Sequence, residues 1–151
     1  RTVFFAKGAL EIVKNFGWPP DIIHCSGWMT GLIPLYIKSA YKKDPVFSHS
    51  KVLYSLEPNT FKEKLGKDFL QLANIHANIN AKDLEVFKAG DNTAMNKGGA
   101  HFADGIIYTS DKLDKKWTAE FSKAKGKKIL PFKGWDTDLS EYLEFYHEIA
   151  P

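Results

Sequence analysis

The stretch Pro20-Asp-Ile-Ile-His-Cys-Ser-Gly-Trp-Met-Thr-Gly-Leu-Ile-Pro34 decides the fold of this chain. An apolar run over residues 21–25 predicts a buried strand, which leads through a short loop into a helix. The apolar side chains of that helix recur at helical spacing: Leu32, Ile33, Tyr36, Ile37 and Ala40. In an open parallel sheet, ligands bind where the carboxyl ends of strands meet the amino ends of helices. His24, Ser26 and Thr30 lie at that junction, which makes it the first candidate site.

Strands and helices alternate on both sides of this stretch. The expected strands cover residues 21–25, 51–56, 105–109 and 129–131. The expected helices cover residues 3–16, 30–41, part of 59–74, 82–87, 94–103, 110–125 and a last segment that begins at 138. Short apolar strands separated by helices predict a parallel sheet that is covered on both faces. The expected fold class is therefore α/β, a Rossmann-like parallel sheet with helices on both faces, and the length predicts a single domain over residues 1–151.

Local signals predict how some of these helices begin and which faces they bury. Ser110 is the expected N-cap of the helix over residues 110–125. Asp138 with Glu141 forms a start that resembles a capping box for the last helix. The first helix carries two adjacent apolar stripes, which predict burial over a wide arc. One stripe is Val3, Ala6, Leu10 and Val13, and the other is Phe5, Ala9, Ile12 and Phe16.

Composition argues against several classes of protein. The formal net charge is only +3 and the basic residues are spread along the chain, so they predict a solvated surface and no nucleic-acid partner. No apolar run approaches the ~20 residues that a membrane-spanning helix needs, so no membrane partner is expected. The single cysteine, Cys25, fits a reducing compartment, and with no visible signal peptide the expected localisation is cytoplasmic. The chain begins at Arg1, almost at once inside a helix, which predicts a piece of a longer protein.

Two segments carry a resemblance to a known family. A family motif that reads roughly D-(I/V)-(I/V)-H-x-H-D-W-x-(T/A/G)-(G/A)-L-(V/I)-P is matched by Asp21, Ile22, Ile23, His24, Trp28, Gly31, Leu32, Ile33 and Pro34. A later family segment is matched by Lys97, Gly98, Ala103, Asp104, Ile107 and Ser110. Through the order and spacing of these motifs, nearly the whole chain resembles the N-terminal domain of the bacterial glycogen/starch synthases.

The resemblance implies the N-terminal half of a two-domain glycosyltransferase of the GT-B type. Such an enzyme transfers glucose from ADP-glucose to an α-1,4-glucan, so these two ligands are implied, and no cofactor or metal is expected. The family holds the nucleotide sugar mainly in its C-terminal domain, so a missing C-terminal domain or a partner chain is implied as well. The implied function is glucosyl transfer by the complete protein.

Two departures from the family motif affect this expectation. The second His of the motif, which lies at the transfer site, is Ser26 in this chain, and the Asp that follows is Gly27. They favour an alternative in which the domain is degenerate and binds glucan or nucleotide without turnover.

The candidate site residues gather at the expected strand ends. Ser26, at the position of the family His, and His24 are the catalytic candidates. The candidate substrate contacts are Gly27, Trp28, Thr30, Glu57 and Asn59, because the ends of parallel strands share one rim. Structural alternatives exist for three of these: a hydrogen bond to the backbone for His24, a helix cap for Thr30 and core packing for Trp28.

Other chemistries fit the sequence less well. Adjacent residues of a strand point to opposite faces, so His24 and Cys25 cannot pair as in a thiol hydrolase. No Gly-x-Ser-x-Gly elbow surrounds Ser26, and His101 with Asp104 lacks a third ligand at metal spacing. No Gly-x-Gly-x-x-Gly or Walker motif is present. An unrelated α/β domain that binds a sugar nucleotide or a phosphate, such as an epimerase-like one, stays open.

Overall fold

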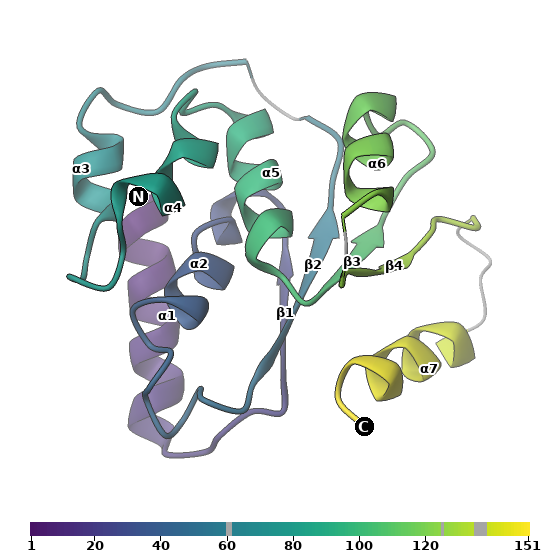
Figure 1. The fold of residues 1–151 in the computed structure, drawn as a ribbon, viewed down its shortest axis with the longest axis horizontal. Coiled ribbons are helices and arrows are strands. Elements are labelled where there is room, and N and C mark those ends of the chain that lie inside the picture. Colours follow the sequence, from purple (N-terminus) through teal and green to yellow (C-terminus); the bar gives the residue numbers. More distant parts are fainter. Residues whose placement is uncertain (60–61, 125, 135–138) are drawn as a thin grey trace.

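The computed structural model describes residues 1–59, 62–124, 126–134 and 139–151. In this part of the chain, four parallel strands form one sheet in the order β1-β2-β3-β4 (Figure 1). The strands are β1 (Ile22–Ser26), β2 (Lys51–Leu56), β3 (Gly105–Tyr108) and β4 (Lys128–Leu130). Each strand pairs with the next one along the chain, and the register places Ser26 beside Ser55. The strands expected from the sequence are confirmed to within one or two residues at their ends.

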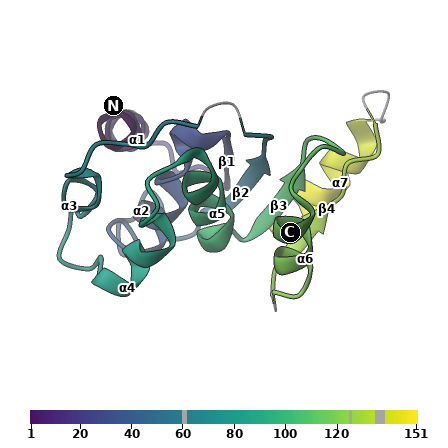
Figure 2. The same ribbon diagram turned by 90° about the horizontal axis from the view of Figure 1, so that it is seen from above.

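Helices cover both faces of this sheet (Figure 2). The described helices are α1 (Thr2–Phe16), α2 (Ile33–Lys38), α3 (Phe69–Ala73), α4 (Ala81–Leu84), α5 (Asn92–Phe102), α6 (Lys115–Ser122) and α7 (Leu139–Ile149), with short 3₁₀ helices η1 (Trp28–Thr30) and η2 (Glu85–Phe87). Helices α1, α2, α5 and α6 contribute to one large core, whereas α7 packs on the opposite face. The structure therefore confirms the predicted α/β fold with helices on both faces.

Alternate residues of the central strand β2 supply the two cores. Val52, Tyr54 and Leu56 point into the large core, and Leu53 points to the other face. There Leu53 joins a small cluster with Ile107, Phe145 and Ile149. This alternation is the period-2 geometry of a strand, and burial on both faces explains why apolar residues of β2 are adjacent in sequence and do not alternate with polar ones.

The helix expected over residues 30–41 is divided in the structure. The chain first forms η1, turns at Gly31 and then forms α2 from Ile33 to Lys38. A Cβ at Gly31 would lie 2.5 Å from the carbonyl oxygen of Met95 in α5, so the turn depends on the missing side chain. Thr30 does not cap α2 as predicted, because its hydroxyl donates back to the carbonyl oxygens of Ser26 and Gly27.

The prediction that α1 is buried over a wide arc is wrong. The stripe that includes Ala6 and Leu10 is buried, but in the second stripe Ile12 is 58% and Phe16 is 79% exposed. The reason is that α1 packs against η1 and α2 on one side only. Periodicity identifies an apolar face, but it does not identify the element that covers it.

Helix starts near the C-terminus also differ from expectation. Ser110 is not the N-cap of α6, which begins at Lys115 after Asp114, whose carboxylate accepts from the Lys116 N–H. The Ser110 hydroxyl instead accepts a hydrogen bond from the Lys112 N–H in a turn. Asp138, the expected start of the last helix, lies outside the described residues, while Glu141 is in the first turn of α7.

The two glycines of α5 allow aromatic rings to pack closely against the helix, although glycine is a weak helix former. A Cβ at Gly99 would overlap the ring of Tyr54, whereas a Cβ at Gly8 in α1 would meet nothing within 4 Å. We therefore expect Gly99→Ala to destabilise the protein by about 1–3 kcal/mol through overpacking. Gly8→Ala, the matched control in an open helix position, should stabilise by roughly 0.5–1 kcal/mol. Urea unfolding of both variants measures this, and equal effects would contradict the packing of Tyr54 on α5.

Cys25 is buried in the large core, and burial raises the pKa of its thiol to about 12. Because the thiolate is the reactive form, Cys25 should label slowly in the native protein and quickly after unfolding. Ellman's reagent at pH 8, with and without denaturant, measures the two rates. Rapid stoichiometric labelling without denaturant would refute this burial.

Candidate functional site

The candidate site is the rim formed by the carboxyl ends of the parallel strands. Ser26 ends β1, and Glu57 and Asn59 follow β2 on the same rim. The amino end of α5 reaches this rim as well, because the Asn59 Nδ2 donates to the Thr93 Oγ1 at 3.1 Å. The structure thus brings Ser26, Glu57 and Asn59 to one edge of the sheet, as the parallel topology predicts.

The loop after β1 is held by the carbonyl oxygen of Gly27. This oxygen accepts hydrogen bonds from the hydroxyls of Thr30 and Tyr54, each at 2.9 Å, and from the Thr30 N–H at 3.2 Å. The Gly27 backbone has φ 70° and ψ 171°, a region that is almost confined to glycine. Three donors on one oxygen fix the loop in this conformation.

A carboxylate occupies the space that Gly27 leaves open. The Ser26 Oγ donates to the Glu57 Oε1 at 2.7 Å, and a Cβ at position 27 would lie 2.8 Å from the Glu57 Oε2. Glu57 is half-buried. Among the described residues, no basic side chain forms an ion pair with it. Ser26, Gly27 and Glu57 therefore form one contiguous polar unit on the rim.

His24 faces the side of the sheet that α7 covers. Its Nε2 lies 2.7 Å from the Ser55 Oγ and its Nδ1 lies 2.6 Å from the Tyr146 hydroxyl, and the Tyr146 ring packs against it edge-on. Partial desolvation lowers the pKa of His24 below its ordinary value. Both ring nitrogens are thus engaged within the protein, where they link β1, β2 and α7.

The remaining candidates have mixed placements. Trp28 is half-buried against the large core, as in the structural alternative. Asn59 is exposed beside the amino end of α5. Tyr54 and Thr93 were not identified from the sequence, because only the fold brings them to the loop and to Asn59. Nothing local in the sequence indicated the partner of the Tyr54 hydroxyl.

The described residues contain no group of three or more His, Cys, Asp or Glu side chains that could hold a metal ion. His101 and Asp104, considered from the sequence, do not form such a group. The Asp104 carboxylate instead accepts from the Lys38 Nζ at 2.6 Å and from the Val52 N–H at 2.8 Å, which joins α2 to β2. Across the same described residues, no helix combines the length and the apolar character that a membrane crossing requires.

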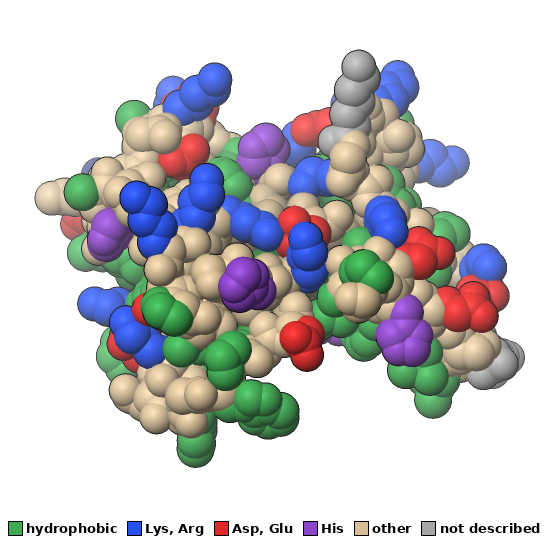
Figure 3. Space-filling model, turned by 60° about the horizontal axis from the view of Figure 1, so that its bottom comes forward, with side chains coloured by type: hydrophobic (Ala, Val, Ile, Leu, Met, Phe, Trp, Pro, Cys, Tyr) green, Lys and Arg blue, Asp and Glu red, His purple; other side chains and the backbone are tan. Residues whose placement is uncertain are grey.

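The molecular surface carries mixed charge. Figure 3 shows Lys and Arg side chains across the middle of one face with Asp and Glu side chains among them, and apolar side chains gathered toward its lower edge. Several lysines are paired with acidic groups, such as Lys97 with Glu120 at 2.7 Å and Lys14 with Asp44 at 2.8 Å. Such interspersed charges are typical of a solvated surface.

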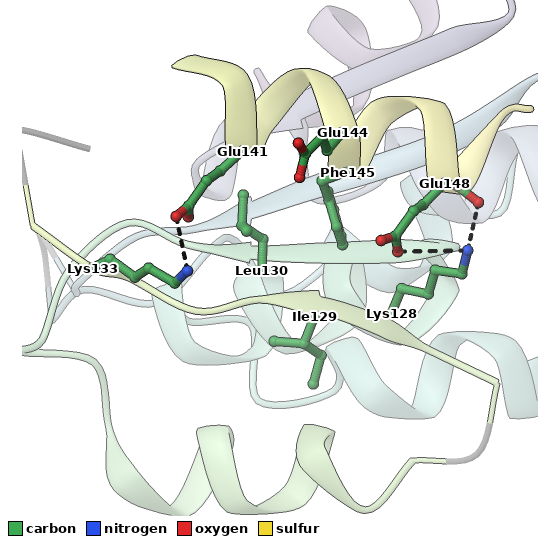
Figure 4. A pocket seen from close by; sticks show the side chains of 8 residues that line it. All are labelled: Lys128, Ile129, Leu130, Lys133, Glu141, Glu144, Phe145 and Glu148. Carbon is green, nitrogen blue, oxygen red and sulfur yellow. Dashed lines mark hydrogen bonds and ion pairs between the residues drawn. The ribbon is translucent and has the colours of Figure 1, made fainter. Parts of the chain in front are cut away.

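A hollow of about 400 Å³ lies between β4 and α7, away from the rim (Figure 4). Its polar side chains are largely committed to one another, because Lys133 pairs with Glu141 at 2.9 Å and Lys128 with Glu148 at 3.8 Å. None of the residues identified from the sequence as site candidates lines this hollow. This hollow is therefore separate from the candidate site at the rim.

Comparison with known proteins relates this chain to bacterial glycogen synthases. The chain is similar to the glycogen synthase of Chlorobium limicola, with 34% identity over 112 residues that make up 73% of this chain and 22% of that protein. It is also similar to the glycogen synthase of Vibrio parahaemolyticus, with 34% identity over an alignment of 157 positions that covers 95% of this chain and 32% of that protein. The chain thus spans between about a fifth and a third of these relatives. No solved structure gives a significant match.

The family model supplies the broadest match. The model of the starch synthase catalytic domain matches residues 1–130, which include β1 to β4 and the whole rim. The match therefore covers 130 of the 151 residues. On this evidence, the chain belongs to the starch synthase catalytic domain family.

Proposed function

We propose that this chain is the N-terminal, acceptor-side part of a glucosyltransferase that acts on α-1,4-glucan with ADP-glucose as donor. The observation that carries the proposal is the polar unit of Ser26, Gly27 and Glu57, which lies at the strand ends where ligands bind in open α/β sheets. Family membership and the similarity to bacterial glycogen synthases support it. The chain itself is proposed to be a single α/β domain over residues 1–151.

The complete reaction would require groups from outside this chain. The chain covers 22% of the length of the Chlorobium limicola glycogen synthase, so most of that protein has no counterpart in this chain. We infer that the nucleotide sugar is held by a C-terminal domain or a partner chain, and that the rim described above forms the facing wall. Transition-state stabilisation then depends on groups preorganised on both sides.

Within the rim, the residues divide into two kinds. Glu57, Asn59 and the half-buried Trp28 are the proposed contacts to sugar, and the Ser26 hydroxyl holds Glu57 in place. Gly27 and Thr30 act through the loop, because their polar atoms are used in hydrogen bonds that fix its shape. His24 is proposed to support β1 from the face that α7 covers, since both of its ring nitrogens are engaged.

The alternative function is a non-catalytic domain that binds glucan or nucleotide. Ser26 favours it, because the motif that this stretch resembles has His at that position. A serine hydroxyl is shorter than an imidazole and carries no charge near neutral pH. We propose a cytoplasmic location for the catalytic and for the non-catalytic alternative. The free thiol of Cys25 supports it.

The first test is glucan synthesis by the purified chain. Incubation with radiolabelled ADP-glucose and glycogen should give no incorporation above the buffer control, because the donor-side groups are absent. The same chain should nevertheless bind maltoheptaose in isothermal titration calorimetry. Clear turnover would refute the division of labour between two domains, and failure to bind the oligosaccharide would refute the acceptor-side role.

The second test concerns Ser26 in the complete polypeptide. Ser26→His should raise glucosyl transfer by ~100-fold or more, because help from a well-placed acid or base is typically worth ~100- to ~10,000-fold. Ser26 is exposed, so a larger side chain fits there. Gly27→Asp should be left out of this variant, because its backbone conformation strains any other residue. A native enzyme that is already fast, and that Ser26→Ala inactivates, would show that Ser26 is itself catalytic.

A further inference from the structure

We infer that the Glu57 carboxylate recognises a neutral sugar ring at this rim, and that Ser26 and Gly27 are positioning residues that hold it there. This inference rests on the proposed function and deepens it, because it names the recognising group and the part of the substrate that it binds. Neither the loop sequence nor the family motif points to Glu57 in this role, since Glu57 arrives from a different strand, 31 positions along the chain from Ser26.

The carboxylate is held in place before any ligand arrives. The Ser26 hydroxyl donates to Oε1 at 2.7 Å, and Oε2 lies over the Cα of Gly27, where any larger residue would place its Cβ at 2.8 Å. The loop beneath is itself fixed by the Tyr54 and Thr30 hydroxyls. A glutamate side chain has several rotatable bonds. Because this one is already held in one conformation, it loses less conformational entropy when a ligand binds.

The charge of the carboxylate selects the ligand. Among the described residues, no basic group pairs with Glu57, so its negative charge is not neutralised within this part of the chain. Sugar hydroxyls can donate charge-assisted hydrogen bonds to such a carboxylate. A diphosphate group would be repelled by it. The rim beside Gly27 therefore fits the glucan and not the nucleotide part of the donor.

The neighbouring groups match a polyhydroxylated ligand. Asn59 is exposed on the same rim and donates through its Nδ2 to Thr93, which leaves its amide oxygen as an acceptor. Trp28, in the same loop as Gly27, supplies an aromatic side chain that is only partly buried. The rim thus offers hydrogen-bond acceptors to sugar hydroxyls, and Trp28 adds aromatic surface in the adjoining loop.

The experiment measures binding of maltoheptaose and, separately, of ADP to the chain by isothermal titration calorimetry. Glu57→Gln keeps the size of the side chain and removes its charge. Loss of hydrogen bonds to a charged group should weaken maltoheptaose binding roughly 10- to 100-fold. Binding of ADP, where it is measurable, should stay unchanged or improve. Glu144→Gln, a matched change on α7 away from the rim, should leave both unaffected.

A second pair of variants tests the positioning role of Ser26. Ser26→Ala removes the hydroxyl that donates to Glu57 and should weaken maltoheptaose binding several-fold, by less than Glu57→Gln. Ser26→Thr restores a hydroxyl and should recover most of the lost affinity. A purely structural role would instead show as a change in thermal unfolding that tracks the loss of affinity in every variant.

The outcomes separate this inference from the proposed function. If the native chain binds maltoheptaose and Glu57→Gln binds it equally well, the inference is overturned and the acceptor-side role stands. If the native chain does not bind maltoheptaose, both are overturned. If Glu57→Gln fails to fold, Glu57→Asp replaces it, because it keeps the charge and is too short for the same contact. Undiminished binding by that variant overturns the inference.

Discussion

The buried hydroxyl of Tyr54 is the point on which the rim depends. Tyr54 lies in the central strand β2, its ring packs where Gly99 has no side chain, and its hydroxyl donates to the carbonyl oxygen of Gly27. One side chain therefore ties the sheet, α5 and the loop after β1 together. Burial raises the pKa of this hydroxyl above its ordinary value, so it stays protonated and donates a hydrogen bond at neutral pH. A fully buried donor needs an acceptor, and the Gly27 carbonyl oxygen at 2.9 Å is nearer to the hydroxyl than the Asn96 Oδ1 at 3.3 Å, so the packing of β2 favours this loop conformation.

Much of this architecture follows from patterns within single segments. The strand over residues 51–56 was predicted with the bounds that β2 has, because apolar residues at 52–54 and 56, interrupted only by Ser55, are typical of a strand that is buried on both faces. The division of the helix after β1 was not predictable in the same way. It depends on the close approach of Gly31 to the backbone of α5, and residue spacing along one helix carries no information about another.

The candidate site shows the same limit. Parallel topology was enough to place Ser26, Glu57 and Asn59 on one rim, because strand ends can be located from the sequence. The hydrogen bond between Ser26 and Glu57 was not foreseen, since it depends on the exact register and on the open space at Gly27. The contact of His24 with Tyr146 joins residues 122 positions apart and depends on how α7 docks on the sheet. The exposed stripe of α1 was wrongly predicted to be buried for a related reason. A helix face is buried only where another element packs on it, and the sequence of the helix does not identify that element.

The departures at positions 26 and 27 acquire a physical meaning in this context. In the motif that this stretch resembles, position 27 carries an aspartate, whereas here it is a glycine with a backbone conformation that an aspartate would strain. A carboxylate is nevertheless present at that point in space, supplied by Glu57 and anchored by the residue that replaces the motif's histidine. The three residues therefore fit together in this structure: Gly27 provides the room, Ser26 provides the donor, and Glu57 provides the charge. The rim therefore still carries a negative group, Glu57, although the His and Asp of the motif are absent from positions 26 and 27.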